Sequence, residues 1–149
     1  MNADDGAGPA LARSLTRRLA RLAVLPGLLV IDAGLAPENF TGPLRRFAPD
    51  LLVLVDAADF SQASKRAMPG AAACLDFDDL DGFSASTHLA PLSLFRLFVT
   101  RELGCEVLLL GIQPAGTGPG RGLSPPVRRC VNRMARFFMN IMAGMDNIR

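Results

Sequence analysis

The chain has 149 residues, half of them hydrophobic, with a formal net charge of +2 at pH 7 and no tryptophan or tyrosine. That length is enough for a single domain, residues 1–149, with a core of its own. The small charge and the missing aromatic residues disfavour a protein that binds nucleic acid. Three scattered cysteines without a C-x-x-C pair indicate reduced thiols. Because we find no signal peptide or membrane-spanning run, we expect a soluble, cytoplasmic protein without membrane insertion.

The first half of the chain contains one helical and two strand-like hydrophobic patterns. Residues 9–23 carry leucines on one face and arginines on another, which predicts an amphipathic helix with a solvated basic stripe. Continuous apolar runs at residues 28–32 and 51–60 predict two strands that are buried on both faces. A short helix is predicted between them, at residues 42–50. Asp56 lies at the carboxyl end of the second of these strands.

The second half of the chain continues the alternation of strands and helices. A weaker strand, a helix, a strong strand and a final helix are predicted in that order, at residues 71–77, 91–103, 105–114 and from 124 or 125 to about 142. Gly104 ends the first of these helices. Buried strands that alternate with helices indicate the α/β class, here a single-domain three-layer α/β/α structure with a twisted, mostly parallel sheet flanked by helices.

Candidate functional residues lie where such sheets bind ligands, at the carboxyl ends of the strands. Asp56 ends a strand, and His88 lies in a turn ahead of a helix. Asp4 and Asp5, in the turn "DDGAGP", reach the same edge only if a strand precedes them. Two carboxylates and one imidazole at this edge would form a three-ligand metal site with open positions, suited to Zn²⁺ or Ni²⁺.

Each of these residues also has a purely structural explanation. Asp56 could cap the turn that follows its strand, and a single histidine such as His88 is more often a structural group than a ligand. Asp5 would favour the positive end of the helix after it by ~0.3–1 kcal/mol. Spacing alone does not show that the three side chains converge.

Other catalytic and binding motifs are disfavoured. The loop "GTGPGRG" at residues 116–122 lacks the G-K-[ST] ending of a phosphate-binding loop and does not match the dinucleotide fingerprint. No G-x-S-x-G elbow is present, which argues against a serine hydrolase. A receiver-like phosphoacceptor domain shares the acid pair and the later aspartate. It also needs a lysine near the end of a late strand, whereas Lys65 lies in a polar connector.

Five segments in this order carry a resemblance to a known family. They are "DDGAGP" (4–9), "IDAGLAPEN" (31–39), "LLVLVDAADF" (51–60), "THLAPLSL" (87–94) and "LLLGIQP" (108–114). Together they resemble the hydrogenase maturation endopeptidases, and they look most like the branch that serves the formate-hydrogenlyase type of nickel–iron hydrogenase.

The resemblance implies an activity and a set of site residues. The activity is one cut near the C-terminus of the hydrogenase large-subunit precursor, made after nickel insertion. The residues that contact metal, and act in catalysis, fall on Asp5, Asp56 and His88. The nickel is supplied by the precursor rather than bound permanently, and it serves either as a recognition tag or as a catalyst. Asp32 and Glu38 are implied as contributors to substrate binding.

The start of the sequence departs from the pattern that this family has. Family members place a hydrophobic strand and a glycine–asparagine turn ahead of the acid pair, whereas Met1, Asn2 and Ala3 stand there in this sequence. Either the start codon is assigned too far downstream or the shortened form is real. We expect a sheet without its first strand, and a chain that is unstable, oligomerises through the exposed edge or fills the gap in another way. The alternative function is an inactive, shortened paralogue that acts as a scaffold or chaperone for the hydrogenase large subunit.

Overall fold

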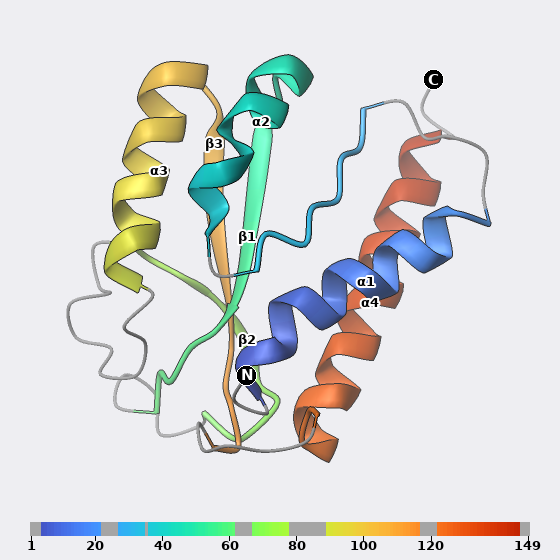
Figure 1. The fold of residues 1–149 in the computed structure, drawn as a ribbon. Coiled ribbons are helices and arrows are strands. Elements are labelled where there is room, and N and C mark those ends of the chain that lie inside the picture. Colours follow the sequence, from blue (N-terminus) through green and yellow to red (C-terminus); the bar gives the residue numbers. More distant parts are fainter. Residues whose placement is uncertain are drawn as a thin grey trace.

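The computed structural model describes residues 4–21, 27–34, 36–61, 67–77, 89–116 and 122–146. Helices lie on both sides of a small sheet, which is the three-layer arrangement expected from the sequence (Figure 1). The elements in chain order are η1 (Asp4–Gly6), α1 (Ala7–Leu19), η2 (Pro37–Phe40), α2 (Thr41–Phe47), β1 (Leu51–Ala57), β2 (Ala72–Leu75), α3 (Leu89–Leu103), β3 (Glu106–Ile112) and α4 (Pro125–Asp146).

The sheet has three strands in the order β1-β3-β2. β1 and β3 run parallel, with Leu51 opposite Glu106 and Ala57 opposite Ile112. β2 pairs antiparallel with the other side of β3, so the described sheet is mixed. An antiparallel strand can follow without a crossover helix, and the described part of the connection between β1 and β2 contains none. The strands predicted at 51–60, 71–77 and 105–114 are confirmed as β1, β2 and β3.

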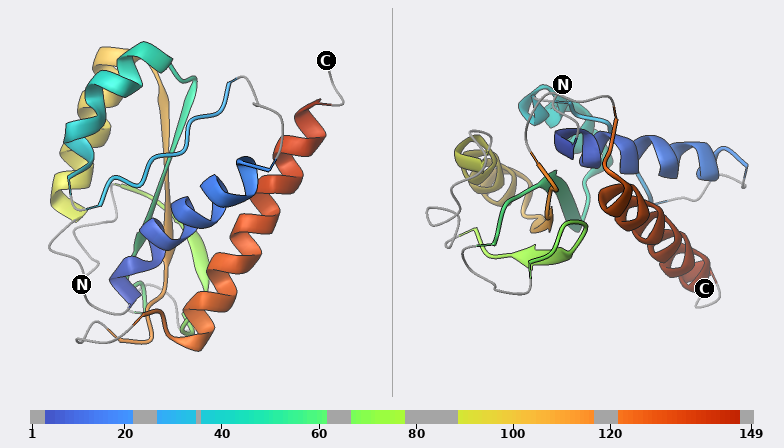
Figure 2. Two further views of the ribbon diagram at one scale, coloured as in Figure 1. Left: turned by 45° about the vertical axis from the view of Figure 1, so that its right-hand side comes forward. Right: turned by 90° about the horizontal axis from the view of Figure 1, so that it is seen from below.

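The two faces of the sheet are covered by different pairs of helices (Figure 2). On one face, Val55 and Ile112 pack with buried residues of α1 and α4. On the other face, Leu54 and Val107 pack with apolar residues of α3, and Leu44 of α2 joins the same layer. Because side chains alternate along a strand, each of the paired strands β1 and β3 contributes to both layers.

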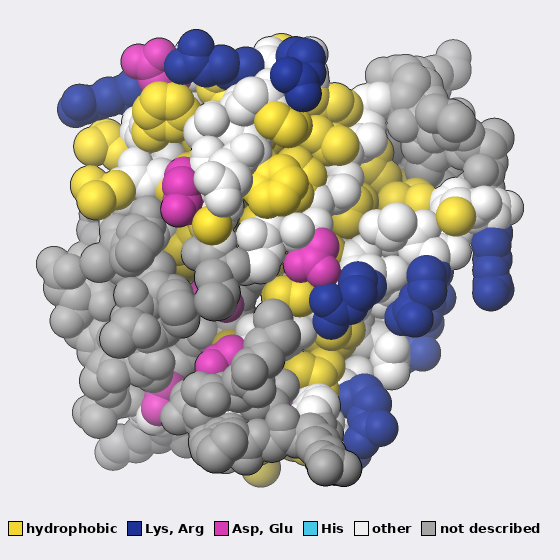
Figure 3. Space-filling model, in the orientation of Figure 1, with side chains coloured by type: hydrophobic (Ala, Val, Ile, Leu, Met, Phe, Trp, Pro, Cys, Tyr) yellow, Lys and Arg dark blue, Asp and Glu magenta, His cyan; other side chains and the backbone are white. Residues whose placement is uncertain are grey.

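The helices begin and end close to the predicted positions. α1 buries Leu11 and Leu15, and its arginines are exposed, as the basic stripe predicted; Figure 3 shows them along the outer side of α1. Ala48 in the left-handed conformation (φ 49°) ends α2, and Gly104 (φ 65°) follows α3. Among the described residues, no helix is both long enough and apolar enough to cross a membrane.

The strand predicted at residues 28–32 is wrong, since residues 28–33 have no regular secondary structure. In the described sheet β1 pairs only with β3, and no strand occurs before β1 in residues 4–21, 27–34 and 36–50. The segment still buries part of its apolar run, because Val30 packs on the α1–α4 layer and Ile31 on the α2–α3 layer. Its hydrophobic residues therefore take part in the core without the hydrogen-bonded ladder that defines a strand.

Candidate functional site

The N-terminal turn η1 holds an unusually buried acid. The Asp4 side chain is 1% exposed. Its Oδ2 accepts a hydrogen bond from the Ala115 N–H at 2.8 Å, and its Oδ1 accepts one from the Ser124 N–H at 2.7 Å. A buried carboxylate is costly unless hydrogen bonds replace its lost water, and these two bonds do so. The turn is thereby attached to the connection between β3 and α4.

The start of α1, directly after this turn, approaches β1 closely, backbone to backbone. A Cβ on Gly8 would lie 2.3 Å from the Val55 carbonyl oxygen and 3.9 Å from the Asp56 Cα. Only glycine fits at that separation. The first turn of α1 is therefore pressed against the carboxyl end of β1, and Asp5, three residues before Gly8, is carried to the same end of the sheet.

Asp56 is the second-last residue of β1 and is half-buried. Its Oδ1 accepts a hydrogen bond from the N–H of Ala57, the last residue of the same strand, at 2.8 Å. The residue opposite it on β3 is Gly111. As a glycine it places no side chain beside Asp56, and a Cβ there would lie 2.5 Å from Leu75 Cδ1.

A buried glutamine organises the loops beyond these strand ends. The Gln113 Oε1 accepts a hydrogen bond from the Phe60 N–H at 3.0 Å, and its Nε2 donates to Asp59 Oδ1 at 3.0 Å. The Gln113 carbonyl oxygen accepts from the Gly70 N–H at 2.8 Å. One side chain and its own backbone therefore connect the segment after β1, the segment before β2 and the end of β3.

Asp59 gives this loop system a dependence on pH. Hydrogen bonds from Ser61 and Gln113 hold the pKa of the Asp59 carboxyl below its ordinary value. A lowered pKa stabilises the fold above the pKa of the unfolded chain and loses that contribution as the pH falls through the folded value, here below about pH 4. When the pH is lowered from 7 to 3, we expect the free energy of unfolding, measured with urea, to fall less in Asp59→Asn than in the wild type. An equal loss in both would contradict this assignment.

The predicted metal site is described in part. Asp5 lies in η1 and Asp56 in β1, and these two elements are in contact, as are β1 and Gly8 at the start of α1. His88 lies outside the described residues. Within the described ranges, no group of three or more histidine, cysteine, aspartate or glutamate side chains is placed to hold a metal ion. The convergence of Asp5, Asp56 and His88 therefore stays a prediction.

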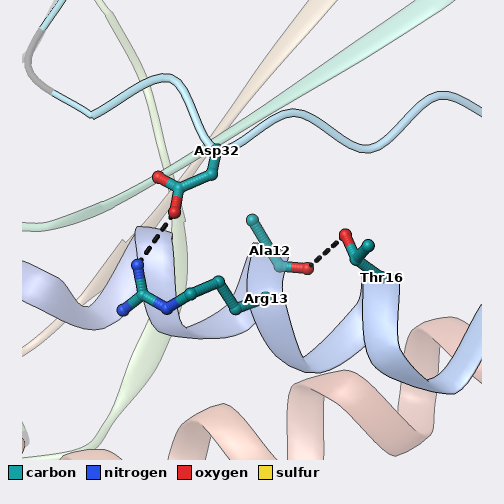
Figure 4. Close-up of polar contacts among 4 residues, drawn as sticks. All are labelled: Ala12, Arg13, Thr16 and Asp32. Carbon is teal, nitrogen blue, oxygen red and sulfur yellow. Dashed lines mark hydrogen bonds and ion pairs between the residues drawn. The ribbon is translucent and has the colours of Figure 1, made fainter.

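The two residues implied in substrate binding are both on the surface. Asp32 Oδ2 pairs with Arg13 Nη1 of α1 at 2.8 Å (Figure 4). This exposed ion pair attaches the irregular segment before η2 to α1, and such pairs contribute roughly 0–1 kcal/mol. Glu38 lies in η2 and is exposed. Their role toward a substrate stays a prediction.

Two of the three cysteines, Cys105 and Cys130, are buried and have the surroundings of structural thiols. Burial raises the pKa of the Cys105 thiol, and burial likewise raises that of Cys130. Both are therefore poor nucleophiles at neutral pH. Cys74 is exposed.

Alkylation should separate these thiols. We expect iodoacetamide at neutral pH to modify Cys74 in the folded protein, and to reach Cys105 and Cys130 only in denaturant, because both are about 1% exposed. Intact mass and peptide mapping measure this. Modification of Cys105 or Cys130 at the rate of Cys74 would contradict the buried placement.

Asp4 and Gln113 are the residues whose positions the sequence did not explain. Their partners are backbone amides far along the chain, at Ala115 and Ser124 for Asp4 and at Phe60 for Gln113. A pattern of side chains carries no signal for bonds of that kind. In the sequence, Asp4 differs from other surface-like acids only in standing next to Asp5 in "DDGAGP".

The fold is a three-layer α/β structure with acidic side chains near the carboxyl end of β1. A family model described as hydrogenase maturation protease matches residues 10–141. The chain belongs to the hydrogenase maturation protease family, whose members are endopeptidases.

Individual relatives agree with this assignment. The chain is 35% identical to the hydrogenase 3 maturation protease of Escherichia coli K12 over 134 residues, which is 88% of this chain and 78% of that protein. The crystal structure of a [NiFe] hydrogenase maturation protease HycI from Thermococcus kodakarensis superposes with a TM-score of 0.79 at 28% identity, over 95% of this chain and 85% of that one. The solution structure of the E. coli endopeptidase HycI gives 0.71 at 30% identity, over 91% and 81%.

Proposed function

We propose that this protein removes the C-terminal peptide from a nickel-loaded precursor of a nickel–iron hydrogenase large subunit, in the cytoplasm. Membership of the maturation protease family supports peptide-bond hydrolysis in hydrogenase assembly. The observation that carries the site is the contact of Gly8 with Val55, because it brings the η1 acids and Asp56 to one end of the sheet. The nickel belongs to the substrate in this proposal.

The donor set of Asp5, Asp56 and His88 fits that substrate. Carboxylate oxygens and an imidazole nitrogen suit a borderline divalent ion such as Ni²⁺. Three protein ligands would leave positions for groups that the precursor provides. A metal held in this way supplies Lewis acidity near the scissile peptide. Asp5 and Asp56 bind and orient the loaded precursor, so that an unloaded precursor is a poor substrate.

Cysteine and serine nucleophiles fit the site less well. Burial raises the pKa of the thiols of Cys105 and Cys130, and both side chains lie in apolar clusters rather than beside the strand-end acids. The sequence has no G-x-S-x-G elbow. These features support a reaction that depends on the carboxylates and His88 instead of a covalent acyl-enzyme.

The test uses the large-subunit precursor with and without nickel. Both forms are incubated with this protein, and the intact mass of each precursor is followed over time. We expect a C-terminal peptide to be lost from the nickel-loaded form only, and His88→Ala to abolish the loss. Equal cleavage of both forms would contradict the role of nickel. No cleavage of either form by the folded wild type would contradict the proposed activity.

A further inference from the structure

Asp4 makes two contacts that join segments far apart in the chain. Ala115 follows the end of β3 by three residues, and Ser124 immediately precedes α4. The two oxygens of one carboxylate accept the N–H groups of both residues, at 2.8 and 2.7 Å. One carboxylate thus bridges the beginning and the end of the β3–α4 connection.

The start of α4 explains why a carboxylate suits this position. A helix N-terminus carries partial positive charge and favours an anion nearby. Pro125 and Pro126 are the first residues of α4 and have no N–H groups, and the N–H of Ser124 directly before them donates to Asp4. The Ser124 hydroxyl oxygen is buried without a hydrogen-bond partner among the described residues. Asp4 therefore accepts the N–H of the residue before the helix, which is the bond that a glutamate at the third helical position makes in a capping box.

The start of α1, directly after the same turn, packs against β1. Gly8 contacts the Val55 backbone, next to Asp56. Asp5 lies between this contact and the Asp4 bonds, directly after Asp4 in η1. With both ends of the turn attached, the backbone of Asp5 has little freedom to move relative to Asp56.

We propose that Asp4 is a positioning residue: its two bonds to the β3–α4 connection set the place of Asp5 relative to Asp56, without Asp4 itself touching the substrate. The expected effect of Asp4 on cleavage rests on the proposed function. Its expected effect on the position of Asp5 rests on the structure alone. An ordinary buried acid would stabilise the fold without moving Asp5.

The test compares Asp4→Asn with Asp50→Asn, the same chemical change at an exposed acid at the other end of β1. An asparagine oxygen can accept one of the two N–H bonds, but its NH₂ group faces the other N–H as a second donor. We expect hydrogen exchange at Ala115 or Ser124 to accelerate at least tenfold in Asp4→Asn, with a changed ¹³C shift of the Asp5 carboxyl. Asp50→Asn should change neither.

Cleavage gives the functional readout. We expect kcat for the nickel-loaded precursor to fall at least tenfold in Asp4→Asn, with KM changed less than twofold. If Asp4→Asn does not fold, Asp4→Glu is used, which keeps the charge and both oxygens but displaces them by one methylene. An unchanged Asp5 signal, or unchanged exchange at both amides, would overturn the proposal. So would faster exchange with normal kcat. If the wild type cleaves nothing while the Asp5 signal moves, the proposed function fails and the positioning role stands.

Discussion

Replacing Gly8 with alanine is expected to destabilise the fold by about 2 kcal/mol or more, because overpacking that displaces backbone costs on the order of 1–3 kcal/mol and rarely relaxes fully. The new Cβ would lie 2.3 Å from the Val55 carbonyl oxygen, and the nearest atoms are backbone, which cannot rotate away. Alanine is favoured over glycine in helices by up to about 1 kcal/mol. Helix propensity alone would therefore make Gly8→Ala stabilising, and a destabilised variant indicates the steric contact with β1. Urea unfolding followed by circular dichroism measures the change in stability.

The matched control is Gly144→Ala, the same change in α4. No atom lies within 4 Å of a Cβ built there, so we expect stabilisation of roughly 0.5–1 kcal/mol. If Gly8→Ala were as stable as Gly144→Ala, the approach of α1 to β1 would be wrong, and with it the placement of Asp5 near the carboxyl end of β1.

Asp56→Asn is expected to lower cleavage of the nickel-loaded precursor at least about 100-fold, the lower end of what one positioned acid or base contributes. The amide oxygen can still accept the Ala57 N–H, so the strand end should keep its local bond and the protein should stay folded. The negative charge at the strand end is what disappears. Intact-mass assays of the precursor measure the rate, and circular dichroism checks the fold.

Asp50→Asn is the control for this prediction as well, since Asp50 immediately precedes the amino end of the same strand. It should cleave as the wild type does. Normal cleavage by Asp56→Asn would remove Asp56 from the site while leaving the family assignment untouched. A loss in both variants would indicate an effect of overall charge instead of a local one.

Most of the secondary structure could be predicted because its signals are local. The leucine and arginine periodicity of α1 and the apolar runs of β1 and β3 depend on neighbouring residues only. The run at 28–32 has the same apolar character as β1, yet forms no strand. A strand exists only when its backbone groups find a partner, and the sequence of one segment does not say whether that partner is present.

The candidate site also combines features predicted from local sequence with features that depend on contacts between distant segments. Asp56 could be placed at the carboxyl end of a strand from the apolar run before it, and the structure has it there. The attachment of Asp5 to that end depends on Gly8 meeting a carbonyl 47 residues further along the chain and on Asp4 reaching amides at Ala115 and Ser124. These contacts depend on packing, so they follow from no spacing in the sequence.

The sequence by itself determined the α/β class, the order and approximate bounds of α1, α2, β1, β2, α3, β3 and α4, and the family to which the chain belongs. Hydrophobic periodicity and short motifs suffice for these, since each is read over a few neighbouring residues. The tertiary structure alone decided that the sheet is mixed, that residues 28–33 stay outside it, and that Asp4 is buried between two chain segments. Those features depend on which distant backbone groups meet, and hydrogen bonds between distant segments form only once the layers have packed.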